Sequence, residues 1–178
     1  MKYFTFFFIL LSFFSCNKTE KTIVQQDINV EKIDSLTLSK KDIAKIEYTD
    51  FGIDSKAKVT LDSWQAYNDI ARAINDLKQA DFTFFTVDRS VFISTIQELE
   101  TTVPKEIDSD AVRARILVLK TKLYKLEEAT NLENTKKIDE LLIIRDVFQS
   151  FSNLTFQVNK KFEKEAQTII KPEINEDH

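Results

Sequence analysis

Few side chains in this chain could carry covalent or metal chemistry. The 178 residues include one cysteine, Cys16, and one histidine, His178, which ends the sequence. Catalytic Cys-His and Ser-His-Asp sites, and most zinc and di-iron sites, need cysteines or histidines held inside a fold, whereas chain ends are usually frayed. The single glycine, Gly52, also rules out a glycine-rich loop for phosphates or dinucleotides. We therefore predict that the protein is not an enzyme and that it holds no cofactor and no metal.

Carboxylates are the remaining groups that could do acid–base work. Glu98 and Glu100 are close in sequence, as are Glu127 and Glu128. Neighbouring positions on a helix point in different directions, so neither pair forms a single site. A two-carboxylate glycosidase also needs a cleft that brings two distant acids together. We interpret these residues as parts of a solvated charged face.

Cys16 lies at the end of an uncharged, mostly apolar segment. Lys2 supplies one positive charge, residues 3–14 carry none, and the small residue Ser15 directly precedes the cysteine. This layout is typical of a signal peptide, and the apolar run is shorter than the about 20 residues that a transmembrane helix needs. The sequence therefore predicts an exported protein with a signal peptide over residues 1–15.

The segment Phe-Phe-Ser-Cys that ends at Cys16 resembles the lipobox of bacterial lipoproteins, and Phe13 in its first position is similar to the looser boxes of the Bacteroidota. The resemblance implies that the Cys16 thiol receives a diacylglycerol, that the signal is cut just before it, and that the new amino terminus is acylated. Lipidation also explains a lone thiol in an exported chain, since one cysteine forms no intramolecular disulfide. The alternative is an ordinary secretory signal with Cys16 as a bystander.

The lipoprotein resemblance also implies a location. Asn17 stands where the known inner-membrane retention signal of the family has an aspartate, so we expect the outer membrane. Lys18, Glu20 and Lys21 are charged, as in some surface-exported lipoproteins of that group. These residues leave the periplasmic face and the cell surface both open. The expected partners are the membrane, through the lipid on Cys16, and another envelope protein.

The composition limits the class of protein further. The formal net charge is −4, and a mildly acidic chain is a poor binder of nucleic acids or anionic membranes, which both attract basic patches. We therefore expect no nucleic-acid partner. Glycine and proline interrupt helices, and the chain has only one glycine and two prolines, Pro104 and Pro172. This scarcity favours long helices joined by short connections.

Residues 16–41 are polar and show no sustained hydrophobic period, which predicts a flexible, lipidated tether. Within the tether, the segment Asp34-Ser35-Leu36 matches the short acceptor motif for O-glycosylation in exported proteins of the Bacteroidota. Ser35 is therefore a candidate for glycosylation, and a chance match of three residues is the alternative.

Residues 42–61 lie between the tether and the main helical region. The segment Ser39–Asp42 resembles a capping box and predicts one or two turns of helix through Ile46. Beyond it, Gly52 and Asp54 predict a turn. We expect an ordered but irregular segment that packs on the helices.

Residues 62–170 contain four amphipathic segments with apolar residues at steps of three, four and seven, which predict four helices. The expected starts are Asp62, Asp81 or Asp88, Asp108 with Asp110 in the first turn, and the capping box Thr130–Glu133. The first helix should end near Gln79, the second before Pro104 and the fourth near Ile169. The apolar stripes are Trp64, Tyr67, Ile70, Ala71, Ile74 and Leu77; Phe85, Phe92, Ile96 and Leu99; Val112, Ile116, Leu119, Leu123 and Leu126; and Leu141, Ile144, Val147, Phe148, Phe151, Leu154, Thr155, Val158 and Phe162.

Four amphipathic helices with short connections need one common core. The sequence therefore predicts an all-α fold, an up-down-up-down four-helix bundle with a long C-terminal helix, followed by a C-terminal tail over residues 171–178. A helical-repeat solenoid is the alternative, although no internal repeat supports it.

Three groups of side chains in the helical region are candidates for binding. Phe82, Phe84 and Phe85 lie at the turn expected between the first two helices; they could anchor a partner or lipid, or close one end of the bundle, and the rarity of exposed aromatic clusters favours closure.

The other two groups are polar. Arg113, Arg115 and Arg145 lie beside the apolar stripes and could bind an anionic ligand, or form ion pairs with their aliphatic stems at the core edge. Ser152 and Asn159 extend a polar strip from Arg145, which could face a partner helix or form a solvated, hydrogen-bonded groove.

Together these features predict a lipid-anchored, non-enzymatic helical-bundle protein of the bacterial cell envelope, acting as a protein-interaction or structural module. The alternative is an envelope module that binds a small apolar or anionic ligand between its helices.

Overall fold

The computed structural model describes residues 38–133 and 135–166, and these residues are mainly helical. The helices in them are α1 (Lys40–Ile43), α2 (Ser55–Ser63), α3 (Gln65–Leu77), α4 (Thr83–Thr86), α5 (Arg89–Thr101), α6 (Asp110–Thr130) and α7 (Lys137–Ala166). The described residues contain no strand, so the predicted all-α class is confirmed. The signal peptide, Cys16, Ser35 and the C-terminal tail lie outside the described residues.

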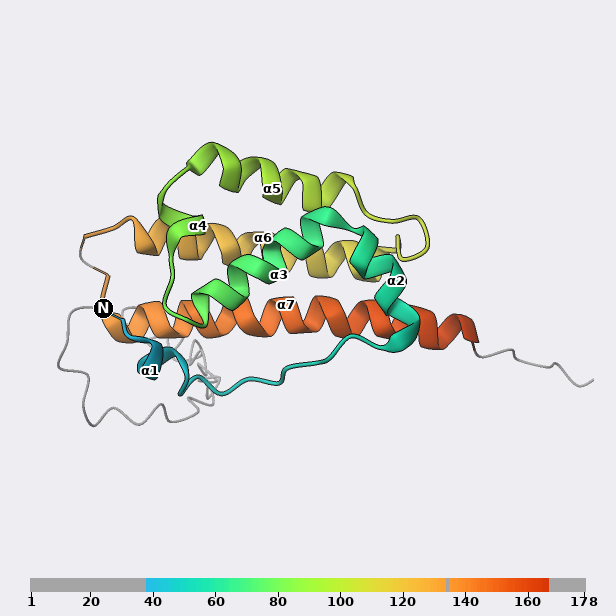
Figure 1. Cartoon of the computed structure of the whole chain (residues 1–178), viewed down its shortest axis with the longest axis horizontal. Coiled ribbons are helices and arrows are strands. Elements are labelled where there is room, and N and C mark those ends of the chain that lie inside the picture. The colour runs from blue at the N-terminus through green and yellow to red at the C-terminus, as the bar shows by residue number, and fades with distance from the viewer. Residues whose placement is uncertain (1–37, 134, 167–178) are drawn as a thin grey trace, which may run out of the picture. The chain divides into compact units, whose positions relative to one another are not determined.

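The two longest helices, α6 and α7, lie side by side and run in opposite directions (Figure 1). Helix α5 packs against α6 and α3, while α4 fills the space where α5 and α6 meet at one end. Helices α1 and α2 both contact α7. Three short helices, α1, α2 and α4, therefore add to the four long ones that the sequence predicted.

The predicted apolar stripes form the core. Most of their side chains are buried, including fully buried Trp64, Phe92, Leu119 and Ile144, whereas Ala71, Phe151 and Phe162 are only partly buried. Among the described residues, every buried side-chain nitrogen and oxygen has a hydrogen-bond partner. This combination of close apolar packing and satisfied polar groups accounts for a stable core.

The start predicted for the first long helix was wrong. Asp62 is not an N-cap; it lies in the last turn of α2 and forms an exposed ion pair with Lys58 (Nζ–Oδ2, 2.8 Å). Asp54 caps α2 instead, because its carboxylate accepts a hydrogen bond from the Lys56 amide (3.0 Å). Only Ala57 and Leu61 of α2 are buried, so its apolar signal is too sparse to reveal a helix.

Trp64 separates α2 from α3. Its backbone is extended (φ −89°, ψ 91°), and its buried ring donates a hydrogen bond from Nε1 to Thr102 Oγ1 (3.2 Å). The turn that this residue makes lets α3 leave the direction of α2. The prediction that Trp64 lies in the core is confirmed, whereas the prediction that it lies inside one continuous helix was wrong.

Of the two proposed starts of the second long helix, Asp88 is the one that the structure uses, and Asp81 lies before the separate short helix α4. Asp88 caps α5, since its carboxylate accepts hydrogen bonds from the Ser90 and Val91 amides (2.8 and 3.3 Å). Asp81 accepts from the Thr83 amide at the start of α4 (2.9 Å). Helix α5 ends at Thr101, before the proline as predicted.

Two further cap predictions were wrong. Ser109, rather than Asp108, caps α6, although Asp110 lies in its first turn as expected. Thr130 does not start the last helix: it is the final residue of α6, and its hydroxyl donates to the Glu127 carbonyl (3.0 Å). The buried stripe of α6 continues to Ala129, so packing holds this segment in α6 until the chain reaches the loop before α7.

The capping box predicted upstream is confirmed. Ser39 caps α1, with the Ser39 side chain accepting from the Asp42 amide and the Asp42 carboxylate accepting from the Ser39 amide. The segment predicted as irregular over residues 42–61 is irregular only in part, because α2 begins at Ser55.

Candidate functional site

Residues 46–54, here called the strap, run along α7 in a non-helical conformation and connect α1 to α2 (Figure 1). Helix α1 fixes the upstream end of the strap, because Ile43 is buried and Asp42 forms an ion pair with Lys137 at the start of α7 (Oδ2–Nζ, 2.9 Å). The Lys137 side chain is 9% exposed, so this pair is well shielded from water. Hydrogen bonds from Ser39 and Lys137 hold the pKa of Asp42 far below its usual range.

One face of α7 binds the backbone of the strap. We call Phe148, Gln149, Ser152, Phe156 and Asn159 the α7 groove. The last four recur at helical steps of three and four and so share that face, and the buried Phe148 lies at its edge. The Thr49 amide donates to Gln149 Oε1 (3.2 Å), and the Phe51 amide donates to Ser152 Oγ (2.7 Å).

Asn159 holds the end of the strap with both atoms of its side-chain amide. Its Oδ1 accepts from the Asp54 amide (3.0 Å), and its Nδ2 donates to the Gly52 carbonyl (2.8 Å). At the other end, Gln149 is itself oriented by a bond from its Nε2 to Asn153 Oδ1 (3.1 Å). The polar contacts of the groove with the strap therefore go to main-chain atoms.

Aromatic contacts supplement these hydrogen bonds. The Phe51 ring lies 4.4 Å from the Phe156 ring, and the Tyr48 ring lies 5.3 Å from the Phe148 ring, measured between centroids. Since the strap side chains in these contacts are only partly buried, the strap lies on the surface of the bundle.

Lys78 links the strap to the end of α3. Its ammonium group lies over the Tyr48 and Phe148 rings (5.7 and 5.8 Å) and 3.2 Å from Asp50 Oδ2. Burial acts to lower the pKa of Lys78, but the contacts with Tyr48 and Asp50 outweigh it, so the pKa is raised. Lys78 therefore remains a cation in this cluster.

The polar strip predicted on α7 thus forms a hydrogen-bonded groove, and its occupant is the chain's own strap. Ser152 and Asn159 both bind the strap, whereas the contact that the structure gives Arg145 is with Asp146, at 3.6 Å. The sequence reasoning missed Gln149 and Phe156. Their spacing from Ser152 would have placed them on the same face, but nothing in the sequence pointed to the strap as the partner.

Phe82, Phe84 and Phe85 pack into the end of the bundle. Phe85 is buried, and the rings of Phe84, Phe85 and Phe92 lie within 5.2–6.0 Å of one another. Tyr124 of α6 meets Phe92 edge-on at 5.3 Å. These contacts match the interpretation that the cluster closes one end of the core.

The three candidate arginines do not converge on one site. Arg113 of α6 makes a bidentate pair with Asp108, with its Nε and Nη2 each 2.6 Å from a carboxylate oxygen. This pairing lowers the pKa of Asp108. Arg115 is exposed on α6, and Arg145 lies on α7 beside Asp146.

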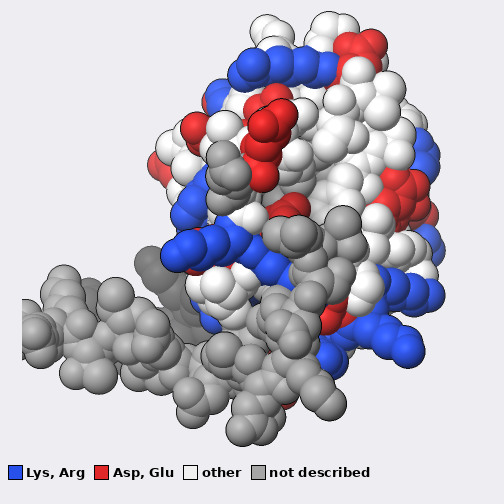
Figure 2. Space-filling view, turned by 90° about the vertical axis from the view of Figure 1, so that its left-hand side faces the viewer, with Lys and Arg blue, Asp and Glu red and all other residues white. Residues whose placement is uncertain are grey.

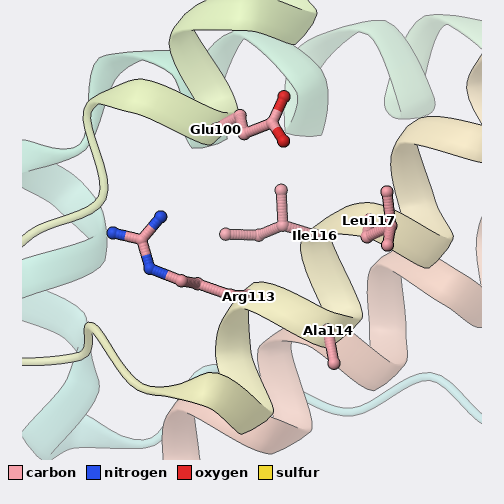
Figure 3. A pocket seen from close by; sticks show the side chains of 5 residues that line it. All are labelled: Glu100, Arg113, Ala114, Ile116 and Leu117. Carbon is pink, nitrogen blue, oxygen red and sulfur yellow. The ribbon is translucent and has the colours of Figure 1, made fainter.

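A shallow hollow of about 270 Å³ lies between the end of α5 and the start of α6. Its lining residues are Glu100, Arg113, Ala114, Ile116 and Leu117. Arg113 and Glu100 border it from two helices, with Ile116 between them (Figure 3). Both charged groups already have partners, since Glu100 Oε2 lies 2.7 Å from the ammonium group of Lys120.

A second carboxylate considered for catalysis, Glu127, also forms a structural ion pair. It is buried and lies 3.4 Å from Arg89 (Oε1–Nε). Residues 38–133 and 135–166 contain no group of three or more His, Cys, Asp and Glu side chains that could hold a metal ion.

The surface charge is mixed. On the visible part of the face at the end where α7 begins, acidic and basic side chains alternate with uncharged ones (Figure 2). None of the helices in the described part of the chain is both long and apolar enough to cross a membrane.

Comparison with known proteins gives no assignment: no protein-family model, no curated protein and no solved structure matches the chain.

Proposed function

We propose that this chain is a lipid-anchored, non-enzymatic helical-bundle protein of the bacterial cell envelope that acts as a protein-interaction or structural module. Lipid on Cys16 would hold it in the outer membrane, on the periplasmic face or at the cell surface. The tether after Cys16 would connect the anchor to the bundle.

The observation that carries this proposal is the attachment of α1 and the strap, together called the N-terminal arm, along α7. The arm does not join the bundle at a single point: α1 is held by Lys137, and the strap is bound as far as Asn159. An anchor at Cys16 would therefore be coupled to the longest helix. The predicted tether would set the distance between the bundle and the membrane.

The ion pairs of the candidate catalytic side chains support a non-enzymatic role. Two of the carboxylates considered for catalysis pair with basic side chains, Glu100 with Lys120 and Glu127 with Arg89. The candidate Arg113 is neutralised by Asp108. Such pairs are typical of structural surfaces, whereas catalytic groups must be left available to a substrate.

Metabolic labelling with a fatty-acid analogue tests the anchor. The wild-type protein should incorporate the label and fractionate with membranes, and Cys16→Ser should lose the label and be released or mislocalised. A Ser15→Ala variant, which keeps a small residue before the cysteine, serves as the matched control and should still be labelled. Unchanged labelling of Cys16→Ser would refute lipidation at this residue.

Crosslinking and affinity capture of the protein from its native envelope tests the interaction role. We expect reproducible recovery of a protein partner, which includes a second copy of this chain. Recovery of no reproducible partner would contradict this part of the proposal.

The hollow between α5 and α6 favours one alternative, an envelope module for a small apolar or anionic ligand. An anionic ligand would have to take the place of Asp108 on Arg113, and Ile116 and Leu117 would offer apolar surface beside it. If this alternative holds, replacing Arg113 by Met should abolish binding of a small organic anion in a calorimetric screen, whereas Arg115→Met should not.

A further inference from the structure

Several elements that are distant in the sequence lie together at the end of the bundle where α7 begins (Figure 1). The end of α6 is tied to α4, because Asn131 Nδ2 donates a hydrogen bond to the Phe85 carbonyl (3.1 Å). The loop after Asn131 leads into α7, where Lys137 forms its shielded ion pair with Asp42 of α1. We call the following exposed residues at this end the entry face: Lys40, Lys41, Lys45, Val87, Val91 and Leu132.

The entry face presents aliphatic side chains to water. Val87 follows α4 and is 75% exposed, Val91 in the first turn of α5 is 52% exposed, and Leu132 follows α6 and is 59% exposed. The core at this end is already closed by the buried Phe85 and the rings around it, so these three side chains are not needed to seal it. Apolar side chains exposed in one region are typical of contact with a protein or a membrane.

The exposed charges of α1 and of the two residues after it are basic. Lys40, Lys41 and Lys45 are exposed, whereas the one acid of this segment, Asp42, is already paired with Lys137. Ammonium groups beside apolar side chains fit a phospholipid surface, where phosphates lie next to acyl chains. The formal charge of the whole chain is −4, so this local group of lysines, rather than the net charge, would attract the phosphates.

The far end of α7 offers an internal comparison. From Lys137 to Asn159, α7 rises by about 33 Å. Helix α2 begins there, because its N-cap Asp54 donates a backbone hydrogen bond to Asn159. Val59 of α2 is 78% exposed, about as much as Val87. Exposure of apolar side chains therefore does not by itself decide which end of the bundle meets a membrane.

The route of the chain favours the entry face. The residues that lead back to Cys16 join the described part at Leu38, one residue before the cap of α1. An anchor at Cys16 would therefore draw this end, rather than the α2 end, toward the lipids. Exposed acids such as Glu133 also lie here, so a surface rich in a zwitterionic lipid fits this end better than a strongly anionic one.

We propose that the entry face docks on the surface of the membrane that holds the lipid anchor, with α7 pointing away from that membrane. The three aliphatic side chains enter the head-group region, and the lysines of α1 contact phosphates. This inference rests on the proposed anchoring at Cys16, and it adds a direct contact between the folded bundle and the lipids.

Quenching by lipids tests the docking. Full-length acylated protein, in which lipid occupies the Cys16 thiol, receives one new cysteine that carries a fluorescent dye: Leu132→Cys on the entry face or Val59→Cys on α2. The protein is placed in vesicles of phosphatidylethanolamine and phosphatidylglycerol that contain a lipid with a nitroxide on its head group. The dye at position 132 should lose fluorescence, whereas the dye at position 59 should keep it.

A second substitution separates docking from tethering close to the lipids. Val87→Asp, combined with the dye at position 132, should restore the fluorescence, because a carboxylate resists transfer into the head-group region. Val59→Asp replaces a valine that is about as exposed and should leave the quenching unchanged. Equal quenching at the two dye positions, or unchanged quenching with Val87→Asp, would overturn the docking.

Acyl labelling of the same preparations checks the anchor. Absence of the label at Cys16 would refute the anchoring and the docking together. A labelled protein without the difference in quenching would refute the docking alone, so the two failures are distinguishable.

Discussion

Helix α7 meets α6 on one side and the strap on another, and the two contacts differ in kind. Toward the core, α7 contributes buried apolar residues such as Ile144, Val147 and Leu154. Toward the strap it contributes hydrogen-bonding side chains and the rings of Phe148 and Phe156. Burial of apolar surface is worth about 25 cal/mol per Å², whereas a hydrogen bond adds only about 1 kcal/mol net.

The difference implies two levels of stability within one helix. The seam between α6 and α7 should open only when the whole bundle unfolds. The strap should open locally at lower free energy, because it is exposed and makes few apolar contacts. Four substitutions test this difference, in order of decreasing expected effect.

Leu119→Ala should cause the largest loss of unfolding free energy. Leu119 is fully buried on α6, and truncating such a leucine costs about 2–5 kcal/mol of unfolding free energy. Urea unfolding followed by circular dichroism measures it. The matched control is Leu117→Ala on the same helix, where the side chain is 57% exposed and the cost should stay below about 1 kcal/mol. Equal losses for the two leucines would contradict the assigned core.

Asn159→Ala should cost about 1–2 kcal/mol, because two hydrogen bonds to the strap are lost. The loss should be local: hydrogen exchange at the Asp54 amide should accelerate while the amides in the middle of α6 stay protected. Gln157→Ala, on the same helix but outside the groove, is the control. If Asn159→Ala accelerated exchange equally throughout the bundle, the strap would not be a separate unit.

Asp54→Ala should cost about 1 kcal/mol, since Asp54 is both the end of the strap and the N-cap of α2. Asp62→Ala removes only an exposed ion pair and should cost less than about 0.5 kcal/mol. Urea unfolding of the two variants compares them directly. A larger effect at Asp62 would favour the helix start predicted from the sequence over the one observed.

Low pH should weaken the attachment of the N-terminal arm to α7, because it protonates Asp42. Of the four effects on unfolding free energy, we expect this one to be the smallest. The pKa of Asp42 is lowered in the folded chain by Ser39 and Lys137, so its contribution is complete above the unfolded value of about 3.9 and is lost as the pH falls below it. The wild type should therefore lose more unfolding free energy between pH 7 and pH 3 than Asp42→Asn. Identical losses in urea unfolding at the two pH values would contradict this.

The apolar side of α7 and its partner α6 was predictable from the sequence. The stripe positions Leu119 and Leu126 are buried because heptad spacing places them on one face, and burial stabilises that face regardless of partner. The capping box at Ser39 was predictable too, since its partners are three residues apart. Local and periodic signals are visible in a single sequence.

The strap was not predictable by the same means. Ser152 and Asn159 stood out as a polar strip, but they bind main-chain atoms about a hundred positions away, as the pair Phe51 and Ser152 does. Every residue has main-chain atoms that can form hydrogen bonds, so the residue types of the strap do not reveal that it binds α7. The prediction that Thr130 starts the last helix was wrong for a different reason. The sequence does contain the capping-box pattern, but packing of Ala129 keeps this segment in α6.

The direction in which the strap runs has a mechanical consequence. The strap and α7 point the same way, with the upstream end of the strap beside the start of α7. Tension on the tether along the axis of α7 would first load the contacts of α1 and, once these opened, the bonds to Gln149, Ser152 and Asn159 together, in shear. Tension across that axis would break them one after another, as in peeling. Resistance to pulling therefore depends on how the bundle is turned relative to its anchor.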